Sequence, residues 1–397
     1  MFAPLRPRTS VLRGIAAGAC AAALLVTAAC GSSSGSSSAA SGSSGSSGSS
    51  SASSGAVPAA SQDLVTKRLA VTDWTSDAPS ISDVAKVKGG SILYVPISLK
   101  IPVFQQVLAG MQQSAGHVGM TVSGCDANYA PAGVAACVNQ ALAQHVSAVV
   151  FDNVPLVLAG QGAEQLKAAH IPIVEGETEA QPGDAQVSYL DTGGPEMIQS
   201  MADWIAVDSG GKADVLVVEE ADSPLQVHYV DAYLMPQFQK ACPACKTTVI
   251  KTSAAQLQNL GSEVSAALLK DPGINYVAVE FDQIANNVVT GLKNSPNGSK
   301  VKMAAAIGNL SSIQRVEAGQ QAWTALADNR FAGWALTDQV LRMLTGGAPL
   351  QTANSPWRMF DKSNIGSVKV AQSSIDDESL WGGDTFSATY LKQWGVS

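Results

Sequence analysis

The sequence predicts an α/β protein made of two doubly wound parallel-sheet lobes with a cleft between them. From Gly89 onward, apolar runs of strand length alternate with segments whose apolar residues recur at helical spacing, which is typical of a parallel sheet covered by helices on both faces. The alternation restarts near Asp214. The chain beyond its N-terminal segment has about 340 residues, enough for one large or two medium domains.

The first set of elements begins with the apolar strand Ser91–Pro96. The helix after it has a buried stripe at i, i+3, i+4 and i+7 spacing, formed by Phe104, Val107, Leu108 and Met111. Further strands of this set are expected at Met120–Ser123, Ala148–Phe151, Ile171–Val174 and Val187–Leu190. Helices are expected between them over 134–142 and 165–169.

A helix over Met197–Val207 leads into the second set. Its strands are expected at Asp214–Val218, Thr247–Ile250, Tyr276–Phe281, Val301–Ile307 and Ala322–Ala327. Its helices are expected at 228–240, 257–269, 284–293, 311–318 and 331–344. Because ligands of such sheets bind beyond the carboxyl ends of the strands, the residues that directly follow each strand are expected to line the cleft.

Residues 1–55 are excluded from this fold. Arg6, Arg8 and Arg13 precede a short apolar stretch rich in Ala and Gly that ends at Cys30, as in a secretory signal, and the stretch is too short for a comfortable transmembrane helix. Its end resembles a bacterial lipoprotein signal, in which the cysteine becomes the lipidated first residue. An ordinary signal with an incidental cysteine is the alternative. We therefore expect a signal peptide over 1–29, and a lipidated Cys30 followed by a flexible Ser/Gly linker over 30–55.

The composition excludes several classes of function. The net charge of −8 becomes −11 once the three arginines of residues 1–29 are removed, and no basic stripe is present, so nucleic acid is not expected as a partner. Outside the Ser/Gly run, the sequence contains no G-x-S-x-G, GxxxxGK[ST] or HExxH motif and no clustered Cys and His residues. We therefore expect neither an enzyme nor a bound metal or cofactor.

Four further cysteines form two local pairs, Cys125 with Cys137 and Cys242 with Cys245. In an oxidising compartment such pairs are most often disulfides. The alternative for Cys242-Pro-Ala-Cys245 is a redox motif, which requires its first thiol at a helix N-terminus. Here a predicted helix precedes the motif and a strand follows it, which favours a structural disulfide.

Several segments, in this order, resemble the type I periplasmic sugar-binding proteins, a group that includes the ribose- and galactose-binding proteins. The strand Ser91–Pro96 followed by Lys100-Ile101-Pro102-Val103-Phe104 resembles the opening of these proteins. Further matching segments are AAHIPIVEGET (168–178), YVAVEFDQIANNVV (276–289) and KMAAAIGN (302–309). The resemblance covers residues 89–350 and rests on the order and pattern of the segments.

The resemblance implies a periplasmic binding protein-like fold of type I, whose hinged lobes close over a small polar solute, most often a sugar or polyol. It further implies delivery of the solute to an ABC permease. We expect a monomer, anchored through Cys30 to the outer face of a bacterial cell membrane. Two alternatives stay open: a receptor for a cationic or aromatic small molecule, and a sensor that presents its closed form to a membrane signalling protein.

The family's crossovers between lobes fall near Leu190–Asp191, near Ala327–Asn329 and after Gly347. The expected organisation is a lead-in segment over 56–88, a first lobe over 89–190 plus 329–347, a second lobe over 191–328, and a tail over 348–397 that packs on the lobes.

Positions that line the family's ligand site hold carboxylates, aromatic rings and amides in this sequence. The candidate ligand-binding residues are Lys100, Phe104, Asp152, Asn153, Glu175, Glu177, Asp191, Tyr229, Phe281, Asp282, Asn309 and Asp328. Carboxylates and amides bind pairs of hydroxyl groups, and aromatic rings stack on the apolar face of a sugar. The arginine that the family places after the Ile-Pro strand is missing, because those positions hold Glu177 and Thr178. The acidic set fits a sugar or polyol, and alternatively a cation.

Structural roles compete with ligand binding at several of these positions. Asp191 is suited to cap the helix that starts near Gly194. Asp152 and Asn153 are suited to a turn, and Tyr229 to the core. The pair that follows strand Asp214–Val218, Glu219-Glu220, is expected to be solvated.

Overall fold

The structure is a computed structural model that describes residues 56–71, 73–177 and 184–396, all within one unit. The predicted signal peptide, Cys30 and the Ser/Gly linker lie outside the described residues. Within the described ranges, no helix combines the length and the apolar character needed to cross a bilayer.

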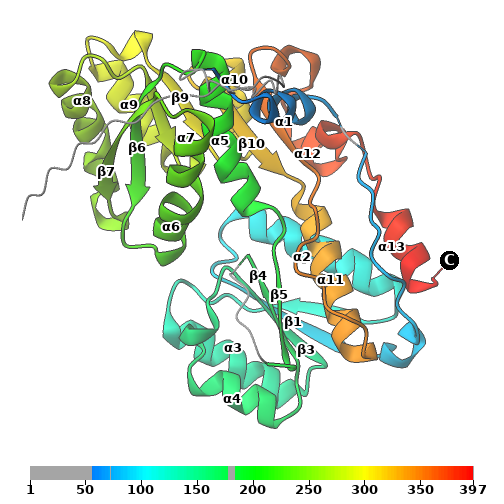
Figure 1. The fold of residues 1–397 in the computed structure, drawn as a ribbon. Helices are drawn as coiled ribbons and strands as arrows, with labels where there is room; N and C mark the ends of the chain where they lie inside the picture. Colours follow the sequence, from blue (N-terminus) through cyan, green and yellow to red (C-terminus); the bar gives the residue numbers. More distant parts are fainter. Residues whose placement is uncertain (1–55, 72, 178–183, 397) are drawn as a thin grey trace, which may run out of the picture. The chain divides into compact units, whose positions relative to one another are not determined.

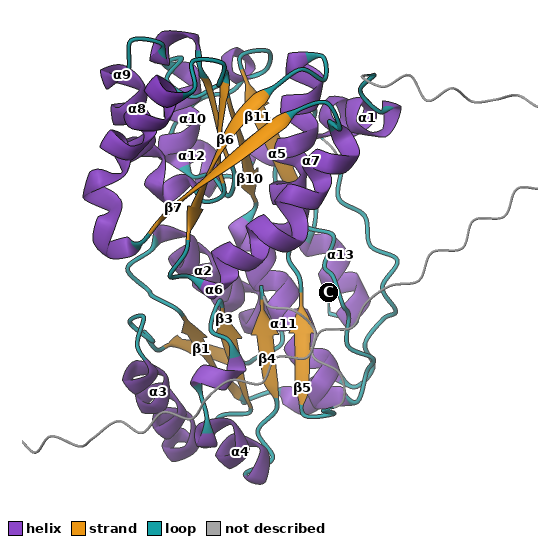
Figure 2. Cartoon of the chain, turned by 60° about the vertical axis from the view of Figure 1, so that its left-hand side comes forward, coloured by secondary structure: helices purple, strands orange, loops and turns teal. Residues whose placement is uncertain are grey.

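The first sheet is parallel throughout, with the strand order β2-β1-β3-β4-β5. Its strands are β1 (Ser91–Pro96), β2 (Thr121–Gly124), β3 (Ala148–Asp152), β4 (Ile173–Gly176) and β5 (Val187–Leu190). Its helices are α2 (Pro102–His117), α3 (Pro131–Gln144), α4 (Gln161–Ala168) and, from later in the chain, α11 (Asn329–Thr345). Figure 1 shows this sheet with α3 and α4 nearby, and Figure 2 shows β1, β3, β4 and β5 in this order. Helices α2 and α11 pack closely, because Gly110 and Gly333 each face backbone atoms of the other helix that would clash with a Cβ.

The second sheet has the order β11-β10-β9-β8-β6-β7. Its strands are β6 (Asp214–Glu220), β7 (Lys246–Thr252), β8 (Tyr276–Val279), β9 (Lys302–Ala305), β10 (Trp323–Ala327) and β11 (Trp357–Asp361). The accompanying helices are α5 (Gly194–Ser209), α6 (Pro224–His228), α7 (Met235–Ala241), α8 (Leu260–Lys270), α9 (Ala285–Asn294) and α10 (Leu310–Glu317). The strands are parallel except for β11, which pairs antiparallel with β10. The two predicted parallel sheets are thus confirmed, while strand β11, from the tail, was not predicted.

The helix predicted over 228–240 is divided in the structure. A π-helical turn over Tyr229–Leu234 joins α6 to α7. Pro236 lies two residues after this turn. It has no N–H, so it cannot donate the hydrogen bond that a regular α-helix would form to the carbonyl four residues earlier. Such π-turns occur frequently at functional sites, and this one begins with the candidate residue Tyr229.

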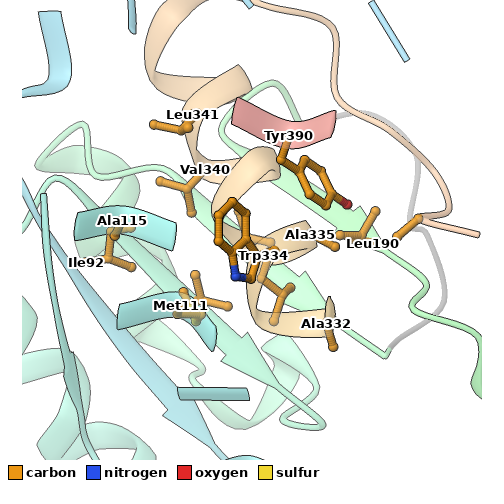
Figure 3. Close-up of a cluster of buried hydrophobic side chains, with 14 of the residues drawn as sticks. Ile92, Met111, Ala115, Leu190, Ala332, Trp334, Ala335, Val340, Leu341 and Tyr390 are labelled. Carbon is orange, nitrogen blue, oxygen red and sulfur yellow. The ribbon is translucent and has the colours of Figure 1, made fainter. Parts of the chain in front are cut away.

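The lead-in segment and the tail pack on both lobes and on each other. Helix α1 (Ala59–Leu69) contacts α5 and β11 of the second lobe, and Trp74 then enters the core of the first lobe. The tail continues from β11 through α12 (Gln372–Asp376) to α13 (Ser387–Trp394), which packs on α11. Trp334 of α11 lies in a cluster with Met111 and Tyr390 (Figure 3) and stacks on Trp394, with ring centroids 5.5 Å apart.

Both predicted disulfides are present. Cys125 is bonded to Cys137, and Cys242 to Cys245. The second bond lies between the end of α7 and the start of β7, as expected for a structural bridge.

Candidate functional site

Side chains from both lobes meet next to the carboxyl ends of the first sheet. We call Tyr94, Asp152, Glu177, Asp191 and Tyr229 the interlobe cluster. Asp152 ends β3 and is 3 % exposed; its Oδ2 accepts a 2.5 Å hydrogen bond from the hydroxyl of Tyr94 in β1, and its Oδ1 accepts one from Asn153 Nδ2 at 3.1 Å. Asn153 has a φ of 53°, which is the left-handed conformation that asparagine adopts readily in turns.

Glu177 and Asp191 lie where the chain leaves the first sheet for the second lobe. Glu177 directly follows β4, and its Oε1 accepts from the backbone N–H of Thr192 at 3.2 Å. Asp191 Oδ1 accepts from Gly193 N–H at 2.7 Å. Gly193 is itself the N-cap residue of α5, so Asp191 forms a turn before the helix and is not its N-cap.

Tyr229 of the second lobe approaches the same point. Its ring is 4 % exposed and packs in the second core, while its hydroxyl reaches Gly194 at the start of α5. A Cβ on Gly194 would clash with that hydroxyl and would lie 2.8 Å from Glu177 Oε2. Only a glycine at this position therefore lets Glu177 and Tyr229 come so close together.

The environment of the interlobe cluster favours the protonated forms of its three carboxyl groups. Burial raises the pKa of Asp152 to about 6. Burial, and then the neighbouring charges of Asp191 and Asp152, raise the pKa of Glu177 well above its usual range. Burial also raises the pKa values of Asp191, Tyr94 and Tyr229. Because no member of the cluster is cationic, hydroxyl or ammonium donors of a ligand are the groups that would relieve this repulsion.

A second set of side chains lies on loops of the first lobe. Lys100 is exposed, and its Nζ donates to Asn128 Oδ1 at 2.6 Å. Tyr129 is 61 % exposed, and its backbone is in the left-handed conformation. Its pKa is raised mainly by partial burial and secondly by the negative charge of Glu220, which belongs to the second lobe. An exposed aromatic ring held near an acid of the opposite lobe is suited to stacking on a ligand.

Several candidate residues have local structural partners instead. Phe104, expected next to a ligand, is 6 % exposed and packs in the core of the first lobe. Asn309 caps α10 in a capping box with Ser312. Asp328 caps α11 by accepting from the N–H groups of Arg330 and Phe331.

Two buried acids are also engaged within their own lobes. Glu175 Oε1 accepts from Leu156 N–H at 2.7 Å. Asp282, next to the half-buried Phe281, is ion-paired with Arg315 of α10 and accepts from Gln321 Nε2 at 3.1 Å. Arg315 was not predicted, because a helix-borne arginine far from the strand ends has no signal in the sequence.

Two acids at the carboxyl ends of β6 and β8 differ from expectation. Glu219 was expected to be solvated but is 1 % exposed and accepts from Lys251 Nζ at 2.8 Å. Glu280 was not singled out, yet it is fully buried, and its pKa is raised by burial to about 8. Its Oε1 accepts from Glu220 N–H at 2.8 Å, whereas its Oε2 has no hydrogen-bond partner among the described residues. The one available signal was its position directly after a buried strand.

The described part of the chain contains no group of three or more His, Cys, Asp or Glu side chains arranged to hold a metal ion. The side chains of the interlobe cluster instead form a binding site rich in hydrogen-bond acceptors.

Comparison with solved structures identifies the fold. The 5-methylthioribose transporter solute-binding protein of Thermotoga lettingae, solved with 5-methylthioribose, superposes with a TM-score of 0.63 and 16 % identity, covering 77 % of this chain and 96 % of that one. A periplasmic solute-binding protein of an ABC transporter from Actinobacillus succinogenes, with bound D-allose, gives 0.60 at 16 % identity, covering 70 % and 100 %. The periplasmic ribose ABC transporter protein of Conexibacter woesei gives 0.60 at 16 % identity, covering 72 % and 97 %.

Sequence comparison gives the family. No curated protein matches the sequence. The model of the periplasmic binding protein domain matches residues 92–348, which include both sheets apart from the edge strand β11 and end just after α11. The match covers more than half of the chain and agrees with the two-lobed α/β fold, so the protein belongs to the periplasmic binding protein domain family.

Proposed function

We propose that this protein is the substrate-binding component of an ABC importer and that it binds a sugar or polyol between its two lobes, at the interlobe cluster. The observation that carries the proposal is the meeting of Glu177 and Asp191 with Tyr229 of the second lobe across Gly194. A ligand held there contacts both lobes, and such shared contacts are what shift a hinged protein to its closed form. The sugars bound in the similar structures support this ligand class.

The cluster suits a polyhydroxylated ligand for two reasons. Carboxylate oxygens accept hydrogen bonds from hydroxyl pairs, and such charge-assisted bonds are stronger than neutral ones. A carboxyl group with a raised pKa, such as that of Asp152, also exchanges between acceptor and donor near neutral pH, which matches the dual character of a hydroxyl group. Tyr129 and Phe281 supply aromatic surface for the apolar face of the ring.

A cationic ligand is the second candidate, and a specific observation favours it. The interlobe cluster combines the carboxyl groups of Asp152, Glu177 and Asp191 without a cationic side chain of its own. An amino-substituted sugar or an amine would satisfy the same acceptors and reduce their mutual repulsion.

The N-terminal segment completes the proposal. A lipidated Cys30 and a Ser/Gly linker of about 25 residues give the body an r.m.s. reach of roughly 25–30 Å from the outer face of the cell membrane. The protein would act there as a monomer that docks on a membrane permease. Mass spectrometry of the membrane fraction tests the anchor, since a Cys30→Ser variant should lose the lipid mass and appear in the soluble fraction.

A thermal-shift screen tests the binding function directly. The panel contains sugars, polyols, nucleosides, amino acids and polyamines, each at about 1 mM. A ligand of micromolar Kd stabilises the folded state by about 4 kcal/mol at this excess, which is an easily measured shift. A hit should weaken by roughly 10- to 100-fold in Glu177→Gln, because the amide offers the ligand one acceptor oxygen fewer than the carboxyl group. The matched control is Glu317→Gln, an exposed acid at the end of α10, which should bind as the wild type does.

The outcomes separate the candidates. Hits among sugars or polyols that depend on Glu177 support the proposal. Hits among amines alone favour the cationic ligand. A panel without any hit contradicts the solute-receptor function.

A further inference from the structure

A cavity of about 410 Å³, lined by none of the residues of the interlobe cluster, lies between α2, the start of α11 and the tail. Gln105 and Ala109 line it from α2, and Asp328 and Arg330 line it from the start of α11. Asp376 of α12 and Trp381 line it from the tail. A volume of this size accommodates a small organic molecule.

The tail wall of this cavity is an addition to the family domain. The family match ends at residue 348, whereas the wall comes from residues 372–381. The wall is firmly placed, because Trp381 is 5 % exposed and its Nε1 donates to the backbone carbonyl of Leu326 in β10 at 3.1 Å. The tail thus adds a wall opposite the face that α2 and the start of α11 form.

Asp328 gives the cavity its chemistry. It is 2 % exposed, and its Oδ1 accepts the two N–H groups that open α11, but its Oδ2 has no hydrogen-bond partner among the described residues. Burial raises the pKa of Asp328 to about 6, and Asp384 adds to this effect. A buried carboxylate oxygen left without a donor costs free energy that a ligand donor would recover.

The nearest cation does not fill this role. Arg330 Nη1 lies 3.2 Å from Glu378 Oε1, and its Nη2 donates to the backbone carbonyl of Asp376 at 3.0 Å. The guanidinium group therefore contacts Glu378 and the backbone of Asp376, and it makes no hydrogen bond to Asp328 Oδ2. Asp328 and Asp376 leave the cavity with an excess of negative charge.

We propose that this cavity is a second ligand site, which binds a small alkylammonium ion whose ammonium group donates to Asp328 Oδ2. The apolar surfaces of Trp381 and Ala109 accommodate the alkyl chain, and the side-chain amide of Gln105 offers a further acceptor. The site shares no residue with the interlobe cluster.

Calorimetric titration of the purified protein with 1,4-diaminobutane tests the proposal, with 1,4-butanediol as the uncharged probe of similar length. We expect the diamine to bind and the diol not to bind. Asp328→Asn should weaken diamine binding by roughly tenfold or more, and it retains a good N-cap residue for α11. Ala109→Phe fills the cavity from the exposed side of α2 and should abolish diamine binding. It tests the site separately from Asp328→Asn and so decides the question if that variant does not fold. Glu177→Gln serves as the matched control and should bind the diamine normally.

Three results would overturn the proposal. The first is an absence of diamine binding to the wild-type protein. The second is equal binding of the diamine and the diol. The third is diamine binding that is unchanged in Ala109→Phe but lost in Glu177→Gln, which would place the diamine at the interlobe cluster.

Discussion

Gly194 offers the sharpest test of closure at the interlobe cluster. Replacing it by alanine places a Cβ that clashes with the Tyr229 hydroxyl and lies 2.8 Å from Glu177 Oε2, below the distance of real contacts. Overpacking of this kind costs about 1–3 kcal/mol. If the cost falls on the form in which Glu177 and Tyr229 meet, solute affinity should drop by roughly 5- to 150-fold.

The same substitution should not harm the fold itself. Alanine in a helix is favoured over glycine by up to about 1 kcal/mol, and Gly194 is the first residue of α5. We therefore expect Gly194→Ala to keep or raise the melting temperature without ligand while it weakens binding. Gly116→Ala in α2 is the matched control, because its Cβ would meet nothing within 4 Å. It should show the same gain in helix propensity with unchanged affinity.

Calorimetric titration with the solute found in the thermal-shift screen, together with melting curves of both variants, makes this measurement. Wild-type affinity in Gly194→Ala would refute the idea that the lobes close on the ligand at this point. A large fall in the melting temperature of the ligand-free variant would show instead that the contact belongs to the basic fold.

Three further predictions concern stability. Because burial raises the pKa of Asp152 to about 6, the folded state binds its proton more tightly than the unfolded state, so this residue should lower the free energy of unfolding by up to about 3 kcal/mol as the pH rises from 4 to 6. Denaturant titrations should show a loss that is smaller by this amount in Asp152→Asn than in the wild type, and an equal loss in both proteins would contradict the assignment. Burial raises the pKa of Glu280 to about 8, so the wild type should lose stability relative to Glu280→Gln as the pH rises from about 4.5 to about 8; the melting-temperature advantage of the variant should grow over this range and level off above pH 8, and a difference that stays constant between pH 5 and pH 8 would contradict the assignment. Joint replacement of Cys125 and Cys137 by serine should cost about 3 kcal/mol, measured by denaturant unfolding, and an unchanged unfolding midpoint would show that the bridge adds no stability.

Much of the fold was accessible from local patterns, and the errors have physical causes. Strand and helix periodicities are properties of short segments, so the buried strands of both sheets were predicted with small shifts at their ends. The tail strand β11 was missed because its place depends on pairing with β10, about 30 residues earlier in the chain, and this pairing leaves no signature in the local sequence of the tail. The break in the helix over 228–240 follows from Pro236, a local signal that the apolar spacing concealed.

By itself, the sequence determined the α/β class, the two lobes, the local pairing of the cysteines and an acidic set of residues after the strands. These features depend on side-chain periodicity and on neighbours a few residues apart. Only the tertiary structure decided which acids act together. Glu177 and Tyr229, from different lobes, meet over Gly194, whereas Asp282 is neutralised by Arg315 and Asp328 caps a helix beside a separate cavity. The reason is that the charge and pKa of a buried acid depend on its partners in space, and the packing of the folded chain alone selects those partners.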